Sequence, residues 1–269
     1  MLWDDILTKS NQTGFDPNKT LQEQLQKAVL ATLSRLNAFH HVVLQGGTAL
    51  RLFYGNPRFS EDLDFVLHPP QSSFDISEYL KKLPSALEPQ FPFLKTITTQ
   101  MQKHDKNLQR GILTTTSDEP LQRVRLHIKL ASVPSHQNTL KILTFPPLQP
   151  AIRVETPTEI FADKLLALGC REYIKGRDLW DIYFLSTEKQ MTPPWTLVWQ
   201  KTKDYQTTAL AVRTHLHRVR TQLEKEGMHI LSSELKRFLP PTVFTAYQNM
   251  FKDIITKIEQ LLQGAYEGE

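Results

Sequence analysis

The chain has 269 residues, of which 40% are hydrophobic and 22% are charged. This composition indicates a folded globular protein with one large domain or two modest ones. A single cysteine excludes an intrachain disulfide and a cysteine-rich zinc site. No apolar run approaches the roughly 20 residues of a membrane span. The N-terminus also lacks the basic start and apolar core of a secretory signal, so we expect a cytoplasmic protein.

The net charge of +4 is spread unevenly along the chain. Residues 1–94 carry eight Lys and Arg against ten Asp and Glu, whereas residues 95–141 carry eight against three. The middle segment is therefore the basic region. Such a balance permits a nucleic-acid partner without requiring one.

The first half of the chain alternates helix and strand signals. Asp16 and Pro17 are typical of a helix start, an N-cap followed by proline at the first helical position, and apolar spacing extends this helix to about His40. Residues 42–44 predict a short buried strand, and residues 48–54 predict a helix. The further elements expected in this half are an acidic strand within 59–67, a helix over 73–83, strands over 93–103, 107–117 and 121–131, and a final strand at 152–154.

The second half of the chain is helical in pattern. It opens at Thr156 with a capping box that ends at Glu159 and has proline at the first helical position. It closes with one amphipathic helix whose apolar face runs from Val243 to Leu262. We therefore expect an α/β domain over residues 1–150 and a helical domain over residues 151–269, packed together so that the second completes an active-site cleft.

Gly46 and Gly47 stand between a predicted strand and a predicted helix. Backbone N–H groups at a helix start bind phosphate, and glycine lets the phosphate approach closely. A simple tight turn is the alternative for the glycine pair alone.

Asp62 and Asp64 make the glycine pair more informative. Their spacing on a strand turns both carboxylates to one face, while Leu63 and Phe65 point into the core. Carboxylate oxygens suit Mg²⁺ that also binds substrate phosphates, with Mn²⁺ as an alternative ion. Two exposed acids on an edge strand are the other interpretation, which the strongly apolar neighbours disfavour.

Lys164 lies in the middle of the apolar arc of its predicted helix. Burying an ammonium group is unfavourable unless it is paired. We therefore favour a lysine that reaches into the cleft to meet a triphosphate, over one that extends past its apolar neighbours to water.

Asp178 shares an apolar stripe with Ile182 and Leu185, and Asp181 lies nearer the edge of that stripe. An inward Asp178 would pair with Lys164 or approach the metal. A helix N-cap at Asp178 is the alternative.

The strand over 121–131 has one apolar and one cationic face. Arg125, His127 and Lys129 share the cationic face, which Lys95, Lys103 or Arg110 would extend. A solvated sheet face is the simplest interpretation, and an electrostatic groove for RNA or nucleotide is the competing one.

Four sequence blocks resemble the AbiEii/AbiGii toxin family, nucleotidyltransferases of the DNA-polymerase-β superfold related to the MenT toxins. The resemblance spans roughly residues 40–185. In chain order the four blocks are Gly-Gly-Thr-Ala-Leu-Arg from Gly46, Ser-Glu-Asp-Leu-Asp-Phe from Ser60, Lys-Leu-Leu-Ala-Leu from Lys164 with Arg171, and Arg-Asp-Leu-Trp-Asp-Ile-Tyr from Arg177.

The resemblance implies an α+β fold, with a mixed-sheet nucleotidyltransferase domain followed by a helical domain. It implies a toxin of a toxin–antitoxin or abortive-infection system that transfers a nucleoside monophosphate from an NTP to RNA, the 3′ end of tRNA, with release of pyrophosphate. A separate antitoxin, usually containing a winged helix, is the implied protein partner.

The resemblance also assigns roles to residues. It implies that Asp62 and Asp64 bind Mg²⁺, that Lys164 contacts the triphosphate, and that Asp178 is the acid of the last block. Phosphate would be held by the glycine turn and the residues around the acidic strand. The resemblance implies phosphate binding by Gly46, Gly47 and Ser60, with Lys164 on the triphosphate. Thr48 and Arg58, which lie beside them in the sequence, complete the predicted phosphate-binding positions. A simple turn residue is the alternative for Arg58 and for Ser60.

One departure from the superfold concerns a third carboxylate, which often faces the first two from a neighbouring strand. The strand over 121–131 offers Arg125, His127 and Lys129 at these positions. Either Asp178 substitutes or activity is weakened. The sequence therefore leaves two alternatives to RNA transfer: a catalytically weak nucleotide- or RNA-binding module, and transfer of a nucleotide to protein.

Overall fold

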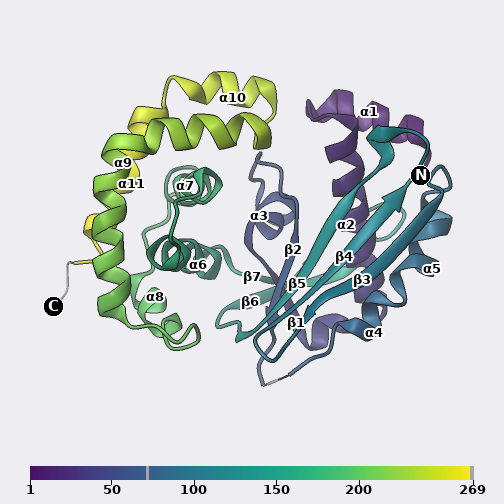
Figure 1. Ribbon diagram of the computed structural model, residues 1–269, viewed down its shortest axis with the longest axis horizontal. Helices are drawn as coiled ribbons and strands as arrows, with labels where there is room; N and C mark the ends of the chain where they lie inside the picture. Colours follow the sequence, from purple (N-terminus) through teal and green to yellow (C-terminus); the bar gives the residue numbers. More distant parts are fainter. Residues whose placement is uncertain (71–72, 267–269) are drawn as a thin grey trace. The chain divides into compact units, whose positions relative to one another are not determined.

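The computed structural model describes residues 1–70 and 73–266 and separates into two compact units (Figure 1). The first unit comprises residues 1–53 and 59–155, and the second comprises residues 54–58 together with the chain from Thr156 onward. Residues 267–269, the end of the predicted helical domain, lie outside the described residues. Within the described part, no helix has both the length and the apolar character that crossing a membrane requires.

The first unit is built on a mixed sheet, in which seven strands are described in the order β3-β4-β5-β2-β1-β7-β6. Strand β2 pairs antiparallel with β1 and parallel with β5, so the acidic strand is central rather than at an edge. The α+β fold expected from the sequence is confirmed. The strands are β1 (Val42–Gln45), β2 (Leu63–Leu67), β3 (Thr96–His104), β4 (Leu108–Thr116), β5 (Arg125–Pro134), β6 (Asn138–Ile142) and β7 (Ala151–Glu155).

Helix α2 covers one face of this sheet and contacts β5 and β7 (Figure 1). It begins as the sequence predicts, because the Asp16 carboxylate accepts a hydrogen bond from the Lys19 N–H and Pro17 takes the first position. Leu21, Leu25 and other apolar residues of α2 are fully buried. The helices of this unit are α1 (Trp3–Thr13), α2 (Pro17–Arg35), α3 (Gly46–Tyr54), α4 (Ser77–Leu80) and α5 (Leu83–Leu87).

Three details of the first unit differ from the sequence prediction. Helix α2 ends at Arg35 rather than His40, because Asn37 adopts a left-handed conformation with φ of 59°. The single helix expected over 73–83 is instead the two short helices α4 and α5. Helix α1 and the edge strand β6 have no counterpart among the predicted elements.

The second unit is helical, and α9, thirty residues long, contacts α6, α7, α10 and α11 (Figure 1). The predicted start at Thr156 is confirmed, since its hydroxyl accepts a hydrogen bond from the Glu159 N–H. The helices are α6 (Pro157–Cys170), α7 (Gly176–Tyr183), α8 (Trp195–Lys201), α9 (Ala209–Phe238), α10 (Pro241–Gln248) and α11 (Phe251–Gln263).

The predicted last helix is two helices. Its apolar face is real, and Ile254, Ile258 and Leu262 of α11 are buried. Helix α10 ends at Gln248, however, and a separate helix, α11, begins at Phe251. The apolar spacing continues across the interruption between the two helices, so periodicity alone could not reveal where one helix ends and the next begins.

Candidate functional site

Asp62 and Asp64 flank the start of β2 in the first unit. Leu63 and Phe65, which alternate with them, are fully buried, so the strand turns its apolar side to the core and its acids to the other face. The Asp62 side chain is 24% exposed and that of Asp64 is 38% exposed. These carboxylates are therefore accessible to a ligand without lying free on the surface.

The glycine turn lies directly beside the acid pair. Gln45, the last residue of β1, is opposite Asp64 in the antiparallel ladder, and α3 starts at the next residue. Gly46 has a φ of +72°, a conformation that favours glycine. A Cβ atom at this position would lie 3.9 Å from Asp64 Oδ2. The structure thus brings the N-terminus of α3 against the Asp64 carboxylate.

Hydrogen bonds fix the segment that carries the acids. The buried Thr48 hydroxyl donates to the Asp62 carbonyl and ties α3 to the acidic strand. From α2, Gln26 Nε2 donates to the Ser60 carbonyl and Gln22 Nε2 donates to the Glu61 carbonyl, both over 2.8 Å. The phosphate-binding roles expected for Thr48 and Ser60 stay predictions. What the structure shows for both residues is a positioning contact.

Lys129 contacts both acids from the neighbouring strand. It lies opposite Asp64 in the parallel β2–β5 register. Its Nζ forms an ion pair with Asp62 Oδ2 and is 3.7 Å from Asp64 Oδ1. From the sequence we considered Lys129 as part of a solvated sheet face or of a groove for RNA or nucleotide. The pairing of β2 with β5, which are far apart in the chain, carried no local signal.

Further cations continue along the sheet from Lys129. Arg110 on β4 is opposite Lys129, and Lys103 on β3 is opposite Arg110. Directly opposed residues share one face of a sheet, so the three form a cationic row that starts at the acid pair. Arg125 and His127 lie on the same face of β5, in agreement with the predicted alternation.

The second unit holds a separate cluster around Asp178 and Asp181. Lys164 Nζ lies 2.8 Å from Asp178 Oδ1 and 2.9 Å from Asp181 Oδ2. Arg171 forms an ion pair with the other oxygen of Asp178. The pairing of Lys164 with Asp178 that the sequence suggested is therefore present. The alternative of an N-cap at Asp178 is wrong, because Lys175 holds that position.

Arg58 belongs to this second cluster. It is 2% exposed, and its guanidinium donates to both oxygens of Asp181, over 2.9 Å from Nε and 2.8 Å from Nη2. Asn56 also donates to Asp181 and accepts from the indole N–H of Trp180. The sequence suggested Arg58 as a phosphate contact, and these buried partners lead us to leave it out of the proposed phosphate site.

Asp181 was placed by the sequence at the edge of its helical stripe, but the structure buries it completely. Burial by itself raises the pKa of Asp181, yet the charges of Arg58 and Lys164 lower it to about 2. For Asp178, burial also raises the pKa, and Lys164 and Arg171 lower it below its ordinary value. Both carboxylates are thus held ionised by the cations around them.

A further buried lysine links two helices of the second unit. Lys201 of α8 is 1% exposed, and its Nζ lies 2.6 Å from Glu159 Oε1 and 2.7 Å from Asp163 Oδ1 on α6. These two acids are therefore committed to a buried ion-pair network that joins α6 to α8.

A metal ion fits Asp62 and Asp64 best. Their oxygens are hard donors of the kind that Mg²⁺ prefers, and both are partly exposed. The ammonium group of Lys129 contacts both carboxylates, which shows that the pair accommodates a positive charge between them. The oxygens of Asp178 and Asp181 are instead directed at Arg58, Lys164 and the partly exposed Arg171.

The comparisons with known proteins identify the family of the chain. The family model described as nucleotidyl transferase AbiEii toxin, type IV toxin–antitoxin system, matches residues 28–263. The solved structure of JHP933 from Helicobacter pylori is similar, with a TM-score of 0.52 and 20% identity over 91% of this chain and 90% of that one. A second H. pylori structure, described as a candidate nucleotidyltransferase, has the same TM-score and identity over 91% and 93% of the two chains.

At this identity the two structures show a shared fold and nothing more. No match was found among curated proteins. The family model spans most of the chain, including the glycine turn, the acid pair and the cluster around Asp178. The protein belongs to the AbiEii nucleotidyltransferase toxin family of type IV toxin–antitoxin systems.

Proposed function

We propose that this nucleotidyltransferase transfers a nucleoside monophosphate from an NTP to RNA, at the 3′ end of tRNA, and releases pyrophosphate. The observation that carries the proposal is the meeting of Asp62 and Asp64 with the glycine turn at the start of α3. Two metal-binding carboxylates beside a helix N-terminus match the charges of a nucleotide triphosphate and its cation.

Asp62 and Asp64 would hold Mg²⁺, and Mn²⁺ offers the same octahedral oxygen preference. When bound, the ion supplies neutralisation of phosphate charge and polarises the phosphoryl group under attack. The backbone N–H groups at Gly46 and Gly47 would bind phosphate oxygens, which favour the positive end of a helix dipole.

Lys164 is proposed to contact the triphosphate. Asp178 is proposed to orient the Lys164 side chain for this contact. The cluster of Arg58, Lys164, Arg171, Asp178 and Asp181 holds three cations against two carboxylates. Its excess positive charge is consistent with a role in binding an anionic substrate. Asp178 would keep the Lys164 ammonium in place through the 2.8 Å contact.

In the proposed reaction, an acceptor hydroxyl oxygen bonds to the α-phosphorus of the NTP. The bond from this phosphorus to the pyrophosphate oxygen breaks, and pyrophosphate leaves with the electron pair. The hydroxyl proton passes to solvent. Strand β5 offers Lys129, not a carboxylate, opposite Asp64, so we assign no base to this strand and place the catalytic contribution in positioning and charge stabilisation.

The cationic row of Lys129, Arg110 and Lys103 supports RNA as the acceptor. Lysine and arginine groups bind backbone phosphates irrespective of sequence, and this row begins at the acid pair. Arg125 and His127 lie on the same face of β5 and extend the proposed surface.

The family also implies an antitoxin as the protein partner. We propose a separate protein with a winged helix for this role. Co-expression with a neighbouring gene that encodes such a protein should restore growth if the chain arrests it.

The test of the proposed function is transfer of label from each of the four α-labelled NTPs to total tRNA in the presence of Mg²⁺. We expect label on RNA with at least one NTP, and none with the Asp62→Ala variant. Asp118→Asn is the matched control, because Asp118 is an exposed acid of the same unit that pairs with Lys95 at the surface.

Other outcomes would decide between the alternatives. Label on polypeptide would indicate nucleotide transfer to protein. ATP binding that calorimetry detects without turnover, and that survives removal of Mg²⁺, would indicate a binding module. Full activity of Asp62→Ala would contradict the assigned site.

A further inference from the structure

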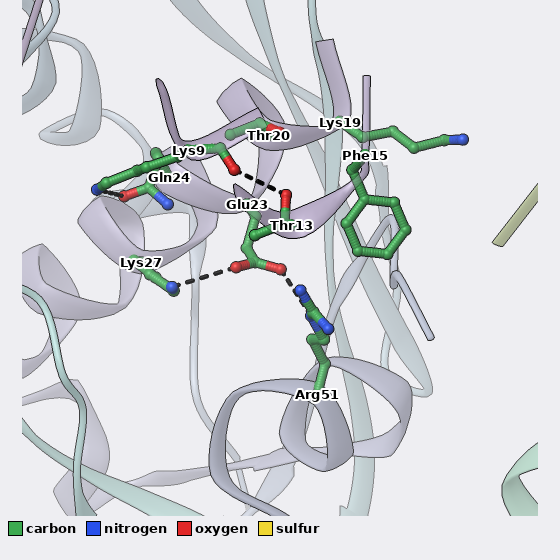
Figure 2. A pocket seen from close by; sticks show the side chains of 9 residues that line it. All are labelled: Lys9, Thr13, Phe15, Lys19, Thr20, Glu23, Gln24, Lys27 and Arg51. Carbon is green, nitrogen blue, oxygen red and sulfur yellow. Dashed lines mark hydrogen bonds and ion pairs between the residues drawn. The ribbon is translucent and has the colours of Figure 1, made fainter. Parts of the chain in front are cut away.

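A pocket with a volume of about 200 Å³ lies among α1, α2 and α3 of the first unit (Figure 2). Cationic side chains approach it from all three helices: Lys9 from α1, Lys19 and Lys27 from α2, and Arg51 from α3. Glu23 is the only acid of the lining. Thr13, Phe15, Thr20 and Gln24 complete the lining.

The concentration of cations in this pocket contrasts with the surrounding sequence. Residues 1–94 are acidic overall, with ten Asp and Glu against eight Lys and Arg. Four of those eight cations line the pocket, against one of the ten acids. The gathering of positive charge is therefore a property of the fold and not of composition.

Local structure explains how the charges meet. Gly14, with a φ of 72°, ends α1, and Asp16 starts α2 two residues later. This tight turn brings Lys9 back against α2, where its Nζ donates to Gln24 Oε1 over 2.9 Å. Glu23 and Lys27 are one turn apart on α2 and face the same way.

Glu23 lies between two of the cations, as Figure 2 shows. Its carboxylate is 2.8 Å from Arg51 Nε and 3.2 Å from Lys27 Nζ. One carboxylate thus serves two cations, and Lys9 adds a third positive charge nearby. Burial and the charge of Lys27 together lower the pKa of Lys9, as expected where like charges are crowded.

The size of the pocket restricts what it can hold. Its 200 Å³ corresponds to about seven water molecules at roughly 30 Å³ each. Sites for drug-sized molecules start at about 300 Å³, so a whole nucleotide does not fit, whereas a phosphate group does. Lysine and arginine groups form their strongest hydrogen bonds with such anions.

We propose that the pocket formed by Lys9, Lys27 and Arg51 around Glu23 is a binding site for a phosphate group of one of the substrates. This inference rests on the proposed function for the identity of the substrates, an NTP and an RNA acceptor. The pocket would anchor one phosphate of either, at a place separate from the acid pair.

Inorganic pyrophosphate in metal-free buffer is the probe for this site, measured by titration calorimetry on the full chain. Without a divalent ion, the Asp62 and Asp64 carboxylates repel the probe. We expect binding to the native protein and to Asp62→Ala alike. The double variant Lys9→Gln/Lys27→Gln should bind at least about tenfold more weakly, since two charge-assisted hydrogen bonds are lost.

Two further variants distinguish loss of the site from partial unfolding and from a general loss of positive charge. Glu23→Gln removes the competing carboxylate and should bind pyrophosphate more tightly, a gain that partial unfolding cannot produce. Lys81→Gln is the matched control, because Lys81 also pairs with an acid close to it in the chain, Glu78, at the surface of the same unit, and it should leave binding unchanged. Equal affinities for the native protein and the Lys9→Gln/Lys27→Gln variant would overturn the proposal, as would weaker binding by Glu23→Gln.

The source of the phosphate is decided by comparing ATP with a fluorescent single-stranded RNA. If RNA supplies it, the Lys9→Gln/Lys27→Gln variant weakens RNA binding and lowers the slope of log K against log salt by about 0.7, the value for one phosphate contact on a single strand. If the NTP supplies it, only ATP affinity falls. An unchanged affinity for both substrates would overturn the assignment to a substrate phosphate.

The pyrophosphate titration and the label-transfer assay can give opposite outcomes, so the anion site and RNA transfer are tested independently. Loss of pyrophosphate binding in the Lys9→Gln/Lys27→Gln variant, with no transfer of label to RNA by the native protein, would leave the anion site in place and reject RNA transfer. Transfer of label that depends on Asp62, with pyrophosphate affinity unaffected by the lysine substitutions, would support RNA transfer and reject the anion site.

Discussion

Each unit contains a pair of carboxylates that lie close together in the chain, Asp62 and Asp64 in the first unit and Asp178 and Asp181 in the second. The surroundings of the two pairs differ. Lys129 contacts the first pair, whose side chains are 24% and 38% exposed. The second pair is at most 5% exposed and is contacted by Arg58, Lys164 and Arg171.

The difference follows from the energetics of buried charge. A carboxylate removed from water must be matched by cations and hydrogen bonds, or the fold becomes less stable. The buried pair of the second unit meets this requirement fully. The first pair keeps solvent access, which a carboxylate pair needs in order to take up a cation with a substrate. The following substitutions test this division of roles, from the largest expected effect to the smallest.

Asp181→Ala should have the largest effect on stability. It leaves Arg58, 2% exposed, without its two-pronged carboxylate partner, and breaking a buried ion pair in this way costs about 3–5 kcal/mol. The free energy of unfolding is measured by urea denaturation followed by far-ultraviolet circular dichroism. Asp118→Asn, which breaks an exposed pair, should change it by no more than about 0.5 kcal/mol. A loss below about 1 kcal/mol for Asp181→Ala would show that the buried cluster is not structural.

Asp64→Asn should affect catalysis rather than stability. Removing one of the two carboxylates proposed to hold the metal ion lowers the rate by about 10²–10³-fold, by analogy with loss of a single preorganised electrostatic contact. The free energy of unfolding should stay within about 0.5 kcal/mol of the native value, because the side chain is 38% exposed. Initial rates of label transfer and a urea titration check both parts. A variant that is fully active but unstable would reverse the roles assigned to the two pairs.

The sequence predicted the first unit well where its signals were local. The alternation of Asp62, Leu63, Asp64 and Phe65 indicated both the strand and its two faces, and the structure buries the two apolar residues completely. The glycine turn was equally clear. Its closeness to Asp64 follows from the short antiparallel pairing of β1 with β2.

Individual contacts between distant segments had no local signal. The resemblance to the superfold placed the strand over 121–131 beside the acid pair, and β5 does pair with β2. Nothing near Lys129 indicates that its ammonium group contacts both acids, and nothing near Arg58 indicates Asp181 as its partner, because both contacts depend on tertiary structure. The helical stripe that placed Asp178 inward also placed Asp181 at its edge. In the structure Asp181 is the more buried of the two, since Arg58 approaches the helix from outside the sequence window that defined the stripe.

Acid should weaken the second cluster through Asp181. Its pKa is lowered from 3.8 to about 2 in the folded protein. A depressed pKa contributes stability that is complete above the ordinary value and is lost as the pH falls through the folded value. The shift corresponds to about 2 kcal/mol, to be lost between about pH 4 and pH 2. Urea titrations across this range should show a steeper loss for the native protein than for Asp181→Asn. Parallel curves would contradict the assignment.

Lys129→Met tests whether the ammonium group of Lys129 occupies the position of the metal at the first pair. Because Lys129 contacts both carboxylates, Mg²⁺ has to displace it, and the ion pair opposes metal binding. Methionine has a similar length without the charge. The affinity of the Lys129→Met variant for Mg²⁺ and Mn²⁺ should therefore rise about tenfold, the equivalent of about 1.4 kcal/mol. Titration calorimetry without nucleotide measures this directly, and Lys103→Met controls for general loss of positive charge along the cationic row. Weaker metal binding by Lys129→Met would instead mean that the lysine holds the carboxylates in the geometry that the ion requires, so the sign of the change separates competition from positioning.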